Sequence, residues 1–321
     1  MYATAASPIE AHKFIYYKMI EEQQQTNNMS CCGRLLAEWR LDMWSTTDVN
    51  GKFIDMKATF RPQPRLLTGI VKLGFLVWSI QIIASAISDS NIPNFWLAYL
   101  TNWGICLTII YQTLSLTRMV LPVSQDPVDF LTRFTWGMFV CVAVAESIIT
   151  ILYWALEYQG EAVTYANIMK HGILMLIIWF DGFVLNRIPL RFKQVLWPYI
   201  LSIMYLIWTG IHAATDIGNP TISDNDPETD DDAIYSSLNW NERPASGVII
   251  SVVLLIVMNP LLFLFMLYIS TLIGRRYIME CNDEGQENGN DVEAPPESPE
   301  SSGGVDVKQP TKVDAADALV Y

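Results

Sequence analysis

The sequence predicts an all-α, polytopic membrane protein: a bundle of six transmembrane helices with both termini in the cytoplasm. Three observations predict this fold class. Hydrophobic residues make up 51% of the 321 residues and gather in six long stretches. The formal charge of −13 comes from polar segments outside those stretches. Lysine and arginine concentrate on one side of the predicted bundle, as they do in cytoplasmic loops.

The six apolar stretches are the predicted spans of a transmembrane domain over residues 66–276. At ~1.5 Å per residue, about 20 residues cross ~30 Å of hydrocarbon. Backbone groups in lipid must be hydrogen-bonded internally, so each stretch should form a helix. No signal peptide precedes them, and the first would itself direct insertion. The stretches cover residues 66–87, 95–121, 131–156, 165–185, 195–213 and 246–273.

Positive charge predicts the orientation of these helices. The side that holds both termini carries Lys52, Lys57, Arg61, Arg65, Arg118, Arg133, Arg187, Arg191, Lys193, Arg275 and Arg276. The other side carries only Lys170 and Arg243. The positive-inside rule therefore places both termini in the cytoplasm and the loop 214–244 outside or in a lumen.

The polar segments carry the acidity of the chain. The loop 214–244 has a net charge of −7, and its acids lack the glycine and bidentate glutamate spacing of an EF-hand. Residues 277–321 are rich in Glu, Pro, Ser and Gly and are predicted to be a disordered cytoplasmic tail. Within the cytoplasmic N-terminal segment 1–65, "RLLAEWRLDMW" (34–44) has two readings: an inner-leaflet contact, or a segment packed under the bundle.

Polar side chains form stripes on several predicted helices. Such residues are costly in hydrocarbon and tend to face a cavity or one another. Read at 3.6 residues per turn, the stripes are Thr101, Thr108, Gln112 and Ser115; Glu146, Thr150, Tyr153 and Glu157; and Tyr205, Thr209 and His212. We therefore expect a polar pocket with Gln112, Glu146, Tyr205 and His212 as binding residues. For Thr108, Thr150 and Ser115, hydrogen bonds back to their own helix are the simpler reading.

Depth in the membrane singles out a possible catalytic pair. Thr101 and His171 each lie six residues inside a predicted helix that starts on the outer side, about 9 Å deep at ~1.5 Å per residue. Threonine is a poor nucleophile until a base removes its proton. Thr101 as nucleophile and His171 as base would need no metal or other cofactor. A metal site of His171, His212, Glu157 and Asp216 is an alternative, without supporting spacing.

Three motifs add a resemblance to a known family. "YLTNWGICLTIIYQTL", "MKHGILMLIIWFDGFVLNRIPLRF" and "YLIWTGIHAATD...YSSLNW" resemble, in this order, the rolling-stone-like membrane proteins. The layout is also similar to the androgen-induced gene family of intramembrane hydrolases, which cleave fatty acid esters of hydroxy fatty acids (FAHFA). That family uses a threonine in an "LT" pair and a histidine in an "HG" pair. The resemblance implies these roles for Thr101 and His171, over roughly residues 66–275.

Two functions follow as hypotheses. The first is an intramembrane carboxylic-ester hydrolase that forms an acyl-threonine and acts on membrane lipids or a lipid ester. The second is a non-enzymatic protein for adhesion, fusion or scaffolding, since "TNWG" and "LNW" favour the rolling-stone-like branch, whose members are associated with myoblast fusion. Protein partners would use the tail or the acidic loop, and no nucleic acid is expected. Either function belongs in the plasma membrane or an endomembrane.

Overall fold

A computed structural model of the chain describes residues 38–47, 53–88, 93–124, 127–158, 160, 162–215 and 233–272. Within these ranges the regular structure is helical, and one isolated β-bridge joins Thr47 to Phe53. The expectations for residues 1–37, for the acidic part of the loop (216–232) and for the tail from residue 273 lie outside the described residues.

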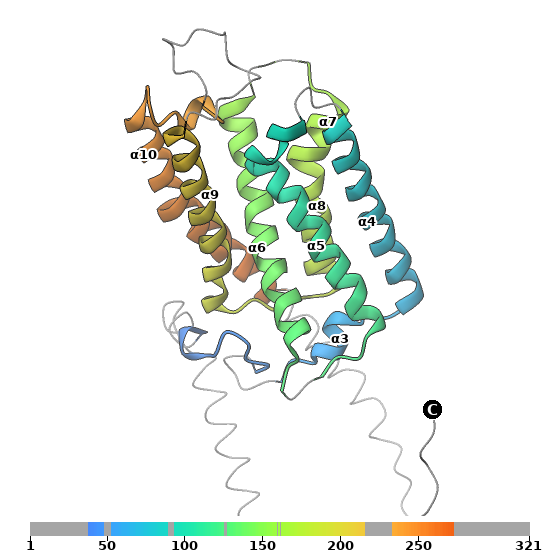
Figure 1. The fold of residues 1–321 in the computed structure, drawn as a ribbon. Helices are drawn as coiled ribbons and strands as arrows, with labels where there is room; N and C mark the ends of the chain where they lie inside the picture. Colours follow the sequence, from blue (N-terminus) through green and yellow to red (C-terminus); the bar gives the residue numbers. More distant parts are fainter. Residues whose placement is uncertain are drawn as a thin grey trace, which may run out of the picture. The chain divides into compact units, whose positions relative to one another are not determined.

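The helices follow one another along the chain and lie side by side (Figure 1). Several long helices contain a π-helical or 3-10 segment, labelled η. The elements are α3 (Met56–Phe60), α4 (Arg65–Ser88), η1 (Pro93–Ala98), α5 (Leu100–Val120), α6 (Phe130–Leu152), η2 (Tyr153–Glu157), α7 (Tyr165–Ile168), η3 (Met169–Ile173), α8 (Leu174–Trp179), η4 (Phe180–Leu185), η5 (Phe192–Val195), α9 (Leu196–Ala214), η6 (Ser236–Leu238), α10 (Pro244–Val252) and η7 (Val253–Met258).

Five helices in the described part of the chain are long and apolar enough to cross a membrane, which fits an integral membrane protein. They are Arg65–Ser88, Phe130–Glu157, Tyr165–Leu185, Phe192–Ala214 and Pro244–Leu272, and they coincide with five of the six predicted stretches. The stretch 95–121 is not one of them. It forms η1 and the 21-residue α5, whose buried face carries the polar residues Asn102, Thr108, Gln112, Ser115 and Arg118.

Helix α6 is the central helix of the bundle. It packs against α5, α8 and α9, and its residues from Thr135 to Ile149 are all buried. A helix that is apolar on every side belongs in an interior. Helices α4 and α10 and the segment η7 instead expose large apolar side chains, among them Leu66, Leu73, Ile249 and Ile256. An outer ring of apolar surface of this kind suits contact with lipid.

The basic residues gather at one end of the bundle, which we call the basic end. The start of α4, the end of α5 and the starts of α6 and α9 lie there, next to α3 (Figure 1). Arg118 pairs with Asp129 at 3.1 Å, and Arg61 Nε donates to the Met119 carbonyl at 3.3 Å. Elements η1, η2, α7 and η6 lie at the opposite end, called here the loop end.

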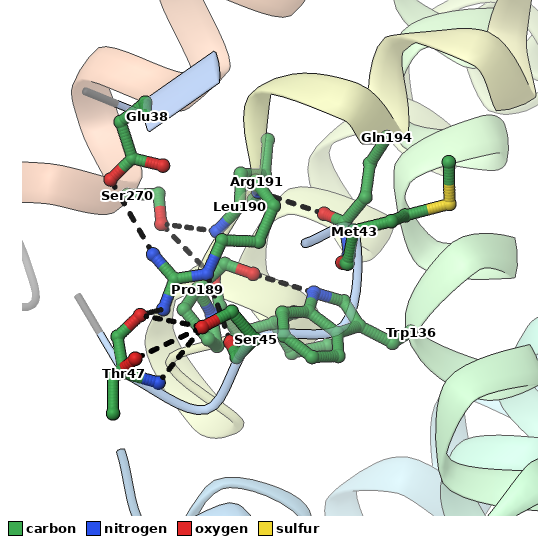
Figure 2. Close-up of polar contacts among 11 residues, drawn as sticks. Glu38, Met43, Ser45, Thr47, Trp136, Pro189, Leu190, Arg191, Gln194 and Ser270 are labelled. Carbon is green, nitrogen blue, oxygen red and sulfur yellow. Dashed lines mark hydrogen bonds and ion pairs between the residues drawn. The ribbon is translucent and has the colours of Figure 1, made fainter. Parts of the chain in front are cut away.

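The described part of the N-terminal segment is held beneath the basic end. Figure 2 shows the guanidinium of Arg191 reaching three groups of this segment: the carbonyls of Ser45 (3.0 Å) and Thr47 (2.7 Å) and the carboxylate of Glu38 (3.4 Å). Trp44 packs edge-on against Trp136, with ring centroids 5.8 Å apart. Residues 38–47 thus pack against the bundle, and contact of this segment with the inner leaflet stays a prediction.

Asp129 caps the start of α6. Its carboxylate accepts hydrogen bonds from the backbone N–H of Thr132 (2.9 Å) and of Ser124 (3.1 Å) and pairs with Arg118. Burial alone would raise the pKa of this carboxyl, but these hydrogen bonds and the arginine charge hold the pKa below its usual value of 3.8. The ionised form is therefore favoured by folding.

A capping prediction follows from Asp129. Its stabilisation is present above the ordinary carboxyl pKa and is lost as the pH falls through the lower folded pKa. Asp129→Ala should cost about 1 kcal/mol at neutral pH, and Asp129→Asn, which can still cap, should cost less. Thermal unfolding in detergent at neutral pH and near pH 3 measures both variants. An alanine variant with wild-type stability at neutral pH would contradict this role.

Candidate functional site

Thr101 lies in the first turn of α5 at the loop end. Tyr99, the residue before the first residue of α5, occupies the cap position, but its side chain makes no capping hydrogen bond. The hydroxyls of Tyr205 and Tyr235 instead accept the Leu100 N–H, each at 3.1 Å. The side chain and the backbone of Thr101 also act on the Tyr235 hydroxyl, and both lower its pKa. Two tyrosines from distant elements therefore satisfy N–H groups that a helix start leaves unpaired.

Tyr205, a predicted binding residue, takes a structural role in this arrangement. It is 1% exposed, and its hydroxyl donates to the Ala98 carbonyl at 3.1 Å. Trp208 Nε1 donates to the same carbonyl at 3.3 Å. Trp103 packs edge-on against the Tyr205 ring, with centroids 5.4 Å apart. These contacts join α9 to the start of α5 and so place Thr101.

His171 lies in the π-helical turn η3, also toward the loop end. Its backbone departs from helical geometry, with φ −116° and ψ 21°. The imidazole is buried and stacks flat on Tyr153, with centroids 3.5 Å apart and planes 4° apart. Its Nδ1 has no hydrogen-bond partner among the described residues. Single π-helical turns and bridge-region backbones are both frequent at functional sites.

The structure brings Thr101 and His171 to one region without pairing them. Elements α5 and η3 pack together, with Ile105, Met169 and Leu174 in one small core. No hydrogen bond joins the two described side chains. Nδ1 of His171 has no partner among the described residues, and the hydroxyl of Thr101 interacts with Tyr235. The catalytic pair therefore stays a prediction.

Glu146 lies deeper, between α5 and α6. It is 1% exposed, and its carboxylate accepts a hydrogen bond from Thr108 Oγ1 at 3.1 Å. A Cβ atom on Gly104 would lie 2.7 Å from Glu146 Oε1, so a larger residue at this position would require the carboxylate to move. The expectation that Thr108 bonds back to its own helix was wrong, because a buried carboxylate accepts its proton instead.

The other two predicted binding residues are buried apart from each other. Both amide atoms of Gln112 lack a partner among the described residues, although its side chain is buried. His212 is enclosed by aromatic rings, with its centroid 5.5 Å from Phe95 and 6.1 Å from Trp208. Thr150 Oγ1 is buried without a partner in the described chain, so it too does not bond back to its helix.

A buried charged cluster was missed by the sequence reasoning. Lys72 Nζ pairs with Asp181 at 2.9 Å, and both side chains are 2% exposed. Asp181 also accepts hydrogen bonds from Tyr111 (2.6 Å) and Ser115 (3.1 Å). Asn186 completes the cluster with bonds to Lys72 and Asp181. The expected back-bond of Ser115 was wrong for this reason. Lys72, a single charge within an apolar stretch, was the available signal.

The segment 233–243, at the end of the acidic loop, closes over the loop end of the bundle. Tyr235 reaches Leu100 and Thr101, and Ser237 Oγ donates to Glu157 at 2.8 Å. Tyr153, Glu157 and Tyr235 thus surround the predicted pair, although sequence reasoning gave none of them a catalytic role. In the described residues, no group of three or more His, Cys, Asp or Glu side chains could hold a metal ion, and Asp216 lies outside those residues.

Comparison of the chain with models of known protein families, with curated proteins and with solved structures finds no match. The likeness to rolling-stone-like proteins therefore rests on the three short sequence motifs alone. The contacts at the loop end are the remaining guide to function.

Proposed function

We propose that this chain is a rolling-stone-like, six-span membrane protein that hydrolyses lipid esters through Thr101 and His171. Both termini would lie on the cytoplasmic side with the basic end. Helix α5 supports a sixth span, since its 21 residues extend ~32 Å at 1.5 Å per residue, about the thickness of the hydrocarbon. Its polar residues face α4 and α6 rather than the surface, which removes their cost in lipid.

The observation that carries the hydrolase proposal is the state of His171. A buried imidazole is normally hydrogen-bonded, yet Nδ1 of His171 has no partner in the described chain. Its backbone also occupies a sparsely populated region inside a π-helical turn. A base needs a nitrogen that can take a proton, and a strained turn packed against α5 that leaves such a nitrogen without a partner in the described chain suits this task.

The chemistry would proceed through an acyl-threonine. Thr101 Oγ1 attacks the carbonyl carbon of the ester while its proton passes to His171, and the carbonyl electron pair moves onto the oxygen. When the carbonyl re-forms, the alcohol leaves with the proton held by His171. A water molecule, deprotonated by His171 in turn, then attacks the acyl carbonyl carbon. The bond to Thr101 Oγ1 breaks, Oγ1 takes the proton back from His171, and the fatty acid is released. The apolar surfaces of α4 and α5 would hold the acyl chain in place.

Thr101→Ala should abolish this activity. We expect full-length protein in detergent micelles to lose at least about 10²-fold in the hydrolysis of a p-nitrophenyl fatty acyl ester, and to lose labelling by a fluorophosphonate probe. Thr113→Ala is the matched control, because Thr113 lies on the same helix, is exposed, and its hydroxyl donates to the Ile109 carbonyl of its own helix (2.8 Å). Hydrolysis and labelling by the alanine variant at the wild-type level would overturn the proposal.

A non-enzymatic role in adhesion, fusion or scaffolding is the second candidate. Two observations favour it. The Thr101 hydroxyl interacts with Tyr235, and no hydrogen bond joins the described side chains of Thr101 and His171. In that role Thr101 would only help to fix the start of α5. A cell–cell fusion or adhesion assay separates the candidates: removal of residues 216–232 should then abolish function, whereas Thr101→Ala should leave it intact.

A further inference from the structure

The segment 233–243 is anchored at several points on the bundle, and we call it the lid. Besides Tyr235 and the Ser237–Glu157 bond, Trp240 Nε1 donates to Thr209 Oγ1 at 3.1 Å. Asn241 Nδ2 donates to the Ala213 carbonyl at 3.2 Å, at the end of α9. Two apolar side chains of the lid, Ile234 and Leu238, are buried as well. These contacts fix the lid to the bundle and so keep the side chain of Tyr235 against the start of α5.

Tyr235 and its neighbour Tyr205 differ in the acceptors available to the proton of the phenol hydroxyl. The hydroxyl of Tyr205 donates to the Ala98 carbonyl. The hydroxyl of Tyr235 accepts the backbone N–H of Leu100, and the hydroxyls of Thr101 and Tyr205 lie beside it. Backbone N–H groups only donate, so the proton of Tyr235 can go to a neighbouring hydroxyl or to an incoming acceptor that takes the place of one.

The phenol of Tyr235 stays a donor over the whole physiological range. Part of the residue is exposed, but its hydroxyl is enclosed, and this burial raises the pKa of Tyr235 to about 12. The carboxylate of Glu157 nearby acts in the same direction, while the bonds from Thr101 act against it. Between the unfolded value near 10 and this folded value, the neutral form is stabilised by the fold.

We propose that Tyr235 is a further catalytic residue, whose hydroxyl donates to the oxyanion formed when Thr101 attacks an ester carbonyl. The inference rests on the proposed function. The ester oxygen would take the place that Thr101 Oγ1 now occupies toward Tyr235, and the Leu100 N–H would lie beside it as a second donor. Attack releases Thr101 Oγ1 from Tyr235 at the moment the oxyanion needs that hydrogen bond.

Tyr235→Phe tests the inference. We expect kcat for the p-nitrophenyl ester to fall about 10²-fold, as when one oxyanion donor is removed, with KM little changed. Tyr165→Phe is the control, because this exposed tyrosine near the loop end accepts only a long bond from Trp78 Nε1 (3.3 Å). It should keep wild-type kcat. Thermal unfolding of each variant shows whether the bundle is intact.

The outcomes distinguish a failure of the proposed role of Tyr235 from a failure of the proposed hydrolase function. Wild-type kcat in Tyr235→Phe, together with an inactive Thr101→Ala, overturns the role of Tyr235 and leaves the hydrolase standing. Wild-type hydrolysis in Thr101→Ala removes the hydrolase itself. If Tyr235→Phe does not fold, 3-fluorotyrosine at position 235 keeps the shape and hydroxyl but makes the phenol more acidic. A changed kcat then supports the donor role, and an unchanged kcat overturns it.

Discussion

Lys72→Met should destabilise the bundle by about 3–5 kcal/mol, because it leaves the carboxylate of Asp181 buried without its cation. The two side chains are 2% exposed and their charged atoms are 2.9 Å apart, so water cannot replace the lost partner. Unfolding by sodium dodecyl sulfate in mixed micelles, followed by tryptophan fluorescence, measures the change. Lys57→Met, at an exposed position of α3, should stay within about 0.5 kcal/mol of the wild type.

The double variant Lys72→Met/Asp181→Leu decides what the ion pair contributes. Apolar residues that replace both members of a buried pair are often neutral or stabilising. The remaining groups, Tyr111, Ser115 and Asn186, can still bond to one another, since Asn186 Nδ2 lies 3.4 Å from Tyr111 and 3.2 Å from Ser115. We expect the double variant to recover most of the loss. A single variant as stable as the wild type would show that the pair is not closed to water.

Gly182→Ala should also destabilise the fold, by about 1–3 kcal/mol or more. A Cβ atom on Gly182 would overlap the ring of Phe139 on α6. That ring has no room to move, because it is fully buried and packs on Phe183 (5.3 Å) and Tyr111 (5.6 Å). The same unfolding measurement applies.

Gly210→Ala is the matched control for this close contact. Gly210 lies within a helix as well, but nothing lies within 4 Å of the position its Cβ would take. Alanine is the better helix former, so this change should be neutral or slightly stabilising. Pairing Gly182→Ala with Phe139→Leu should recover part of the loss. Equal stability of the two alanine variants would contradict the close packing of η4 on α6.

The spans of the helices could be predicted from the sequence, whereas the contacts at the candidate site could not. Five predicted spans coincide with long apolar helices, because the hydropathy of 20 successive residues is a local property. Helix α5 is less apolar. Its polar residues are tolerated because they are buried against α4 and α6, and no local pattern in the sequence reveals these neighbours. Depth counting brought Thr101 and His171 to the same end of the bundle. It could not show that Thr101 meets Tyr235, or that His171 stacks on Tyr153.

The all-helical class and the fit to a membrane could be predicted from the sequence, because each follows from the hydropathy of successive residues, and the basic end from the side on which each loop lies. Which polar groups meet depends on the packing of the helices. Lys72 bonds to Asn186 across 114 residues, and Leu100 bonds to Tyr235 across 135. A buried polar group must find a partner wherever the packing of helices places one, and that packing depends on the shapes of all the helices together.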